Sequence, residues 1–254
     1  IDVIPDYAER MREIATNPYR LAYFLAIRAL IGEGNDQFVD DMYSSNDGRL
    51  VVISRPSFGD VVAISLRTKK IVWRFAVDGV RSDHMAVSPD GRRVVVSAST
   101  GNVVHVLRVA DGKEVGRFPS GGSPHESVFI DGGKRILHAS IGLVYTPLDD
   151  PALDPTKDER VLQVVDAKTF KVLRRYDLRS ALDAIGLDDV STAVRPLTLS
   201  PDERQIYFQL SFFHGYLRLD RRTGAITKVV RLPNLVTDTP RELYLLDSAH
   251  HGIA

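Results

Sequence analysis

The sequence predicts an all-β protein built from repeated four-stranded antiparallel units, and three observations lead to this fold class. A tight-turn sequence followed by an apolar run occurs four times, and its first three copies are 43 and 42 residues apart. Each repeat also contains four short apolar runs separated by turn residues, which is typical of antiparallel strands. A period of roughly 40–50 residues with four strands per repeat indicates a β-propeller in which each repeat forms one blade.

The four turns set the register of the blades. They read SNDG at 45–48, SPDG at 88–91, IDGG at 130–133 and SPDE at 200–203. The second repeat is the most regular, with apolar runs at 84–88, 93–99, 102–109 and 113–119 and the hairpin turn Asp111-Gly112 between the last two. We expect blades at about 38–80, 81–121, 122–179 and 193–233, and the start of a further blade at 248–254.

Residues 1–37 are expected to hold the end of an outer strand and a helical insertion, the one helical region of the chain. Asp6 can cap a helix from Tyr7 to Ala15, and Asn17-Pro18 can cap and begin a second helix that runs to about Ile31. Apolar residues at helical spacing in the second helix predict one buried face. Because a lysine-rich polar face is missing, this pattern favours a docked insertion over a membrane-surface anchor.

Two stretches of the second repeat carry a resemblance to a known family. AVSPDGRRVVVSAS at 86–99 and VVHVLRVADGKEVGRFP at 103–119 are similar to the repeats of the bacterial YVTN-type, YncE-like propellers, relatives of the WD-repeat propellers. The resemblance extends over about 38–254. The family tetrapeptide is replaced by VVIS, VVSA, LHAS and YFQL, and the threonine-glycine turn is intact only at Thr223-Gly224. The resemblance implies about seven blades, of which four are visible.

The ends of the chain suggest that it is part of a longer protein. It begins at Ile1 and stops at Ala254 inside an expected strand, so we expect further blades beyond both ends. We also expect an extracytoplasmic or secreted location, with the export signal absent from this chain; the absence of cysteine suits an exported bacterial protein but fits many cytoplasmic ones too.

Composition excludes several classes of function. Lys+Arg and Asp+Glu both number 33, which gives no electrostatic reason to expect nucleic acid or an anionic membrane as partner. A chain without cysteine has no disulfide, thiolate nucleophile or cysteine-bound metal. No run of 18 apolar residues is present to span a membrane. Neither a glycine-rich phosphate loop nor a nucleophile elbow occurs.

The extra length of the repeats falls on one face of the predicted propeller. The turns between the first and second and between the third and fourth strands are all short, whereas segments 5–31, 178–194 and 233–249 join successive blades and 142–159 joins the second and third strands of its blade. Long loops on a rigid scaffold are common places for binding sites. We therefore expect a small-molecule or protein ligand on the long-loop face.

Unusual polar residues gather on the same face by repeat arithmetic. The innermost strands begin with Asp40/Asp41, Asp83/His84, His125/Glu126 and Arg195/Pro196, and Tyr145 falls in a long loop nearby. The candidate ligand-binding residues are His84, His125, Glu126, Arg195, His214, His250, His251, Arg55 and Asp41. Imidazole and carboxylate groups are ligands for zinc, manganese or iron. A divalent metal ion would be held by His84, His125, Glu126, His214 and His250.

A structural role competes with this interpretation at each position, because a single histidine often serves only to bond a neighbouring loop. His105 alternates with core valines and is expected to be structural, and His138 is a lesser candidate. Adjacent residues of a strand point to opposite sides, so only one of His125 and Glu126 can face the channel. The acidic segment 148–159 lacks calcium-loop spacing and is expected to be a solvated loop.

Three hypotheses for function follow. The absence of a complete catalytic motif favours a binding propeller of the YncE-like type, with a His/Glu/Arg-lined site at the channel mouth. The first alternative is a metal-dependent lyase or hydrolase that uses the same His/Glu cluster. The second is a structural assembly module, in which another chain completes the propeller.

Overall fold

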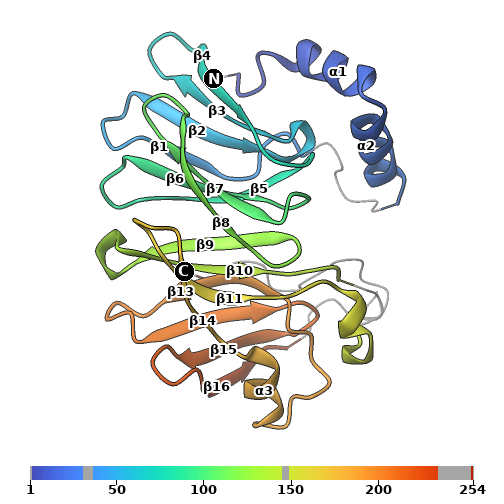
Figure 1. The fold of residues 1–254 in the computed structure, drawn as a ribbon, viewed down its shortest axis with the longest axis vertical. Coiled ribbons are helices and arrows are strands. Elements are labelled where there is room, and N and C mark those ends of the chain that lie inside the picture. Colours follow the sequence, from blue (N-terminus) through green and yellow to red (C-terminus); the bar gives the residue numbers. More distant parts are fainter. Residues whose placement is uncertain (1, 31–36, 145–148, 234–252, 254) are drawn as a thin grey trace. The chain divides into compact units, whose positions relative to one another are not determined.

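A computed structural model describes residues 2–30, 37–144, 149–233 and 253. The described strands form four separate four-stranded antiparallel sheets, each made of strands consecutive in sequence (Figure 1). Such sheets are propeller blades, so the predicted fold class is confirmed. No helix among the described residues has the length and apolar character needed to cross a membrane.

The chain divides into two compact units, 1–119 and 120–254, which are described separately below. The first unit holds two helices and blades 1 and 2. Its elements are α1 (Tyr7–Thr16), α2 (Pro18–Leu30), β1 (Met42–Ser44), β2 (Leu50–Arg55), a 3₁₀ turn (Pro56–Phe58), β3 (Asp60–Ser65), β4 (Ile71–Ala76), β5 (Ser82–Val87), β6 (Arg93–Ala98), β7 (Val103–Arg108) and β8 (Glu114–Pro119).

The second unit holds blades 3 and 4. Its elements are β9 (Pro124–Ile130), a 3₁₀ turn (Asp131–Gly133), β10 (Arg135–Ser140), a 3₁₀ helix (Pro151–Thr156), β11 (Leu162–Asp166), β12 (Val172–Arg175), α3 (Leu178–Asp183), β13 (Val194–Leu199), β14 (Gln205–Leu210), β15 (Gly215–Asp220) and β16 (Ile226–Arg231).

The two N-terminal helices lie where the capping residues predict them, but one cap works differently. The Asn17 side-chain oxygen accepts a hydrogen bond from the backbone N–H of Arg20 at 3.1 Å, which caps α2. Asp6 precedes α1 without a capping bond, because its carboxylate binds Arg55 instead. The prediction that residues 5–31 hold the only helix is wrong: α3 forms between blades 3 and 4, where Asp177 caps it by accepting from Ser180 N at 3.0 Å.

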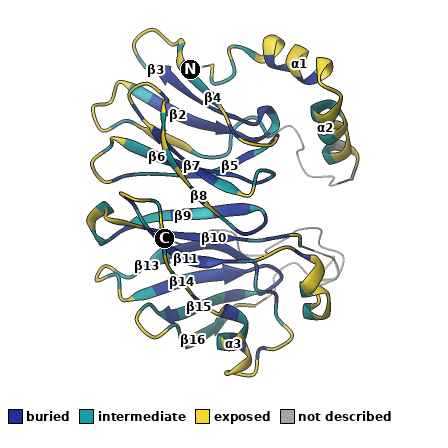
Figure 2. Cartoon of the chain, in the orientation of Figure 1, coloured by how far each residue is buried: buried dark blue, intermediate teal, exposed yellow. Residues whose placement is uncertain are grey.

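Each unit has its own apolar core, built from the second and third strands of its blades. Figure 2 shows these strands as mostly buried, whereas the outermost strands β4, β8, β12 and β16 alternate or are exposed. In the first unit Trp73 on β4 packs on the turn after β7 and donates its indole N–H to the carbonyl of Val109 at 2.9 Å. A Cβ on Gly112 (φ 68°) would lie 2.5 Å from that ring, so the close packing requires glycine.

Candidate functional site

Strand pairing confirms that the polar residues predicted at the channel mouth share one register. Met42, Met85, Ser127 and Leu197 pair with equivalent residues of the second strands, which are Ile53, Val96, His138 and Phe208. The position just before each of them is occupied by Asp41, His84, Glu126 and Pro196. The position before that is occupied by Asp40, Asp83, His125 and Arg195. The turn spacing alone therefore aligned the innermost strands correctly.

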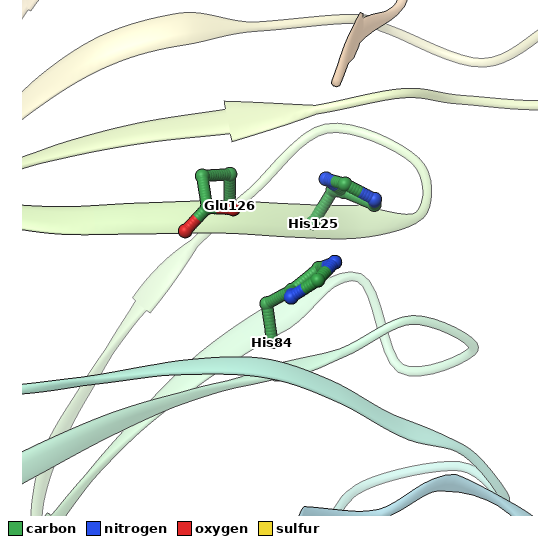
Figure 3. Close-up of side chains that lie close together, drawn as sticks. All are labelled: His84, His125 and Glu126. Atoms are coloured by element: carbon green, nitrogen blue, oxygen red, sulfur yellow. The ribbon is translucent and has the colours of Figure 1, made fainter. Parts of the chain in front are cut away.

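In the first unit, this register brings four polar residues of blades 1 and 2 together. The imidazole Nδ1 of His84, on β5 (Figure 3), lies 3.4 Å from a carboxylate oxygen of Asp41 and 3.9 Å from Oδ2 of Asp40. The ligating atoms of Asp40, Asp83 and His84 all lie within 4.8 Å of one another. Two carboxylates and one imidazole at this spacing can hold a divalent cation.

Hydrogen bonds fix the three carboxylates of this cluster. Asp41 accepts from the backbone N–H of Met85 at 2.6 Å, which links the strands of blades 1 and 2. Asp83 accepts from the Ser99 hydroxyl at 2.7 Å. Asp40 accepts from the Gln37 amide at 2.8 Å through Oδ1. The cluster is therefore positioned by contacts outside itself, as a preorganised site requires.

Asp40 is the most electrostatically perturbed member of the cluster. Its side chain is only 14% exposed, and Oδ2 is buried without a hydrogen-bond partner among the described residues. Burial raises the pKa of Asp40 to about 7; the charges of Asp83 and Asp41 add to the rise, while His84 opposes it. A cation would relieve this crowding of buried negative charge.

In the second unit, the same two register positions carry His125 and Glu126, adjacent on β9 (Figure 3). His125 is buried at 4% exposure and Glu126 is half-buried. Arg195, at the equivalent position in blade 4, is also buried and donates from Nε to the Ser211 hydroxyl at 2.8 Å. His214 is half-buried just before β15. Tyr145, His250 and His251 lie outside the described residues.

Arg55 takes part in a buried ion network that attaches α1 to blade 1. Its guanidinium has no exposed surface and donates to both carboxylate oxygens of Asp60, at 2.8 and 2.9 Å, and to Asp6. Asp60 is fully buried and also binds Arg74, and Asp6 binds Arg10 of α1. The contacts of Arg55 are those of a residue that positions the helical insertion.

Two histidines have the structural surroundings expected of core residues. His105 is fully buried; its Nε2 accepts from the backbone N–H of Asp78 at 3.1 Å, and its Nδ1 lies 2.8 Å from Glu114. His138 is fully buried between the hydroxyls of Ser120 and Ser127, at 2.8 and 2.9 Å. Burial lowers the pKa of His138 to about 3, so its imidazole is neutral at pH 7.

Most described residues of the acidic segment 148–159 are solvent-exposed, as expected, but the loop also holds a buried ion pair. The ammonium of Lys157 is fully buried and donates to the carbonyls of Asp149 and Asp150 at 3.0 and 2.6 Å and to the Asp154 carboxylate at 2.8 Å. Although burial opposes it, bonds from Arg160 and Ser191 hold the pKa of Asp149 below its usual value. The oxygen-rich loop thus carries its own cation, the lysine side chain.

Asp40 and Asp83 precede two of the predicted ligand residues but were not themselves among the predicted ligands. The signal was available, because both directly precede residues that were selected, Asp41 and His84. Two adjacent residues of a regular strand point to opposite sides, a limit that was stated for His125 and Glu126 and that would apply equally to Asp83 and His84. Ser82 pairs with Ala98 and Met85 pairs with Val96, so β5 has one more residue than β6 between these two pairs. At this β-bulge the side chains of Asp83 and His84 both reach the cluster.

The fold and this register define the protein as a β-propeller with a polar cluster at the start of its innermost strands. Among solved structures, a chain of hydrazine synthase from Kuenenia stuttgartiensis is similar, with a TM-score of 0.58 and 20% sequence identity over 77% of this chain. The match covers 50% of that chain, so this chain spans about half its length. A similarity at this level of identity is one of fold. No family model and no curated protein matches the chain.

Proposed function

We propose that this protein is a ligand-binding propeller of the YncE-like type that holds a divalent metal ion at the start of its innermost strands. The observation that carries the proposal is the close approach of Asp40, Asp83 and His84, whose ligating atoms lie within 4.8 Å of one another. Mixed nitrogen and oxygen donors favour zinc, manganese or iron over magnesium or calcium.

Three protein ligands leave coordination positions for a further ligand or water. In the second unit, His125 and Glu126 occupy the register positions of Asp83 and His84, and we propose them as ligand-contacting residues of blade 3. The buried Arg195 continues the same register in blade 4 and supplies a guanidinium suited to an anionic group.

Titration calorimetry with Zn²⁺ and Mn²⁺, on protein stripped with EDTA, tests the proposal. We expect one equivalent to bind to the wild type, and binding to weaken at least tenfold, about 1.4 kcal/mol, in Asp40→Asn and in His84→Ala. His105→Gln is the matched control, because His105 is a histidine of the same blade with both ring nitrogens engaged in the core. Metal affinity equal to that of the wild type in both site variants would refute the assignment.

The same titration addresses the second unit. A lower affinity in His125→Ala or Glu126→Gln would add that residue to the metal ligands, whereas unchanged affinity would confine the metal to the first unit. Loss of folding in these variants, measured by thermal denaturation, would identify the side chains as structural.

A further inference from the structure

A groove of about 790 Å³ lies on the short-turn side of the second unit, at the opposite end of its strands from His125 and Glu126. It is formed by β10 to β12 of blade 3 together with the two short turns of blade 4, at 202–204 and 220–222. Its volume is within the range of small-molecule sites. Five arginines line it: Arg135, Arg174, Arg204, Arg221 and Arg222.

Blade 1 of the first unit and blade 3 of the second unit carry different residues at one equivalent position of their outer strands. The groove lies beside this position in blade 3. Trp73 pairs with Ala63 on the outer strand of blade 1, and Arg174 pairs with Val164 at the same place in blade 3. In the first unit the Trp73 indole packs against the Gly112 turn and donates to Val109 O. In the second unit the bulky ring is replaced by a guanidinium on a thin side chain.

Arg174 is held in place by the neighbouring blade. Its Nη1 donates to the carbonyls of Arg221 and Arg222 at 2.9 and 2.8 Å, and its guanidinium stacks on the Tyr176 ring at 4.4 Å. Gly224 of the neighbouring turn has a φ of 83°, a backbone conformation that favours glycine, and it lies beside this guanidinium. The hydrogen bonds of Arg174 to described residues use Nη1, which leaves the N–H groups of Nε and Nη2 for a ligand.

The carboxylates at the groove already accept hydrogen bonds, two of them within their own turns. Asp220 accepts from the backbone N–H of Thr223 at 2.7 Å and from its hydroxyl at 3.0 Å. Asp202 accepts from the Ser200 hydroxyl at 2.6 Å. Glu203 accepts from the backbone N–H of Asp131 at 2.6 Å and lies 3.4 Å from Arg221.

Several of the arginines, in contrast, keep unused donors. Arg221 is paired with both Asp131 and Glu203, so its charge is compensated. Arg204 is 82% exposed and only 3.6 Å from Asp202, and Arg222 is exposed with no side-chain partner among the described residues. Together with Arg174 they supply three forked donors around an apolar floor that includes Leu173, which is 52% exposed.

We propose that this groove binds a small polyanion, a molecule with two or more phosphate or carboxylate groups. Bidentate hydrogen bonds between guanidinium and oxyanion groups are strong and directional, and three arginines can engage more than one such group. The groove residues all belong to the second unit, and none of them is a proposed metal ligand.

Calorimetry on the full chain with two probes, pyrophosphate and citrate, tests this proposal. We expect at least one probe to bind, with an affinity that falls as salt rises because the attraction is ionic. Tighter binding of pyrophosphate would assign the site to phosphate groups, and tighter binding of citrate to carboxylates. If neither probe binds at concentrations up to about 10 mM, the proposal is overturned, because any binding free energy would then be smaller than about 3 kcal/mol.

Three variants and one control locate the binding. Arg174→Trp restores the residue found in blade 1, so it should keep the fold while filling the groove, and binding should fall at least tenfold. Arg204→Gln and Arg222→Gln should each weaken binding severalfold. Arg49→Gln is the matched control, because Arg49 has the same turn position, 83% exposure and a 3.7 Å approach to Asp47 in blade 1. Equal affinity in Arg174→Trp and Arg49→Gln would refute the location.

Discussion

His138 makes the stability of the second unit depend on pH in a way that can be measured directly. Its imidazole occupies the register position held by Ile53, Val96 and Phe208 in the other blades, which is a core position. Burial lowers its pKa from 6.5 to about 3. Between these pH values the unfolded chain therefore binds one more proton than the folded chain. The stabilisation that comes from keeping His138 neutral is complete above pH 6.5 and is lost as the pH falls toward 3.

The size of the effect follows from the shift. Each pH unit below 6.5 costs about 1.4 kcal/mol, so lowering the pH to 4.5 should cost about 3 kcal/mol through this one side chain. Replacing His138 by Gln removes the titrating group while keeping polar contacts to Ser120 and Ser127. The difference in unfolding free energy between wild type and His138→Gln should therefore shift by about 3 kcal/mol in favour of the variant between pH 8 and pH 4.5.

Urea denaturation followed by circular dichroism at several pH values measures this difference. Ser127→Ala is the control, since it removes a hydroxyl bonded to the same imidazole without removing a titrating group. Its difference from the wild type should vary little with pH. If the unfolding free energies of the wild type and of His138→Gln fall in parallel between pH 8 and 4.5, the imidazole is not kept neutral by burial.

Two further predictions concern buried ion pairs, where removal of one partner leaves an uncompensated charge. Asp60→Asn should destabilise the first unit by about 3–5 kcal/mol, because Arg55 would keep only Asp6. It should also make α1 sensitive to limited proteolysis. If α1 is as resistant to the protease as in the wild type, the ion network does not anchor this helix. Lys157→Met should destabilise the second unit by a similar amount, about 3–5 kcal/mol, because it leaves Asp149 and Asp154 without the ammonium. Thermal denaturation checks this, and a melting temperature equal to that of the wild type would show that Arg160 alone satisfies the loop.

The blades could be predicted from the sequence because their determinants are local. Turn residues such as Asp90 bond the hydroxyl of Ser88 and the backbone N–H of Arg92 within the same few residues. Asp47 and Asp202 repeat this pattern in blades 1 and 4. Since each turn fixes the two strands beside it, the repeated turn also fixed the register of the innermost strands, and with it the alignment of Asp41, His84 and Glu126.

The ion pairs of the long connections could not be predicted, because their partners are distant in sequence or belong to loops without a repeat. Arg55 was a candidate ligand by its place in a loop, but Asp6, which binds it, comes from the helical insertion 49 residues away. Lys157 and Asp149 lie in a segment with no counterpart in the other blades. Periodicity predicts what is repeated, and these contacts occur only once.

The same comparison between blades distinguishes a core histidine from the residues of the two proposed sites. A polar residue at a repeated core position, such as His138 among Ile53, Val96 and Phe208, is isolated in the apolar interior and bonds hydroxyls supplied for it. His84 instead shares its register with acidic residues, and its nearest charged neighbours are carboxylates. Arg174 occupies in blade 3 the position of Trp73 in blade 1, and the groove beside it is lined with arginines. We therefore base both proposed sites on residues that distinguish one blade from the others and that lie among further polar side chains.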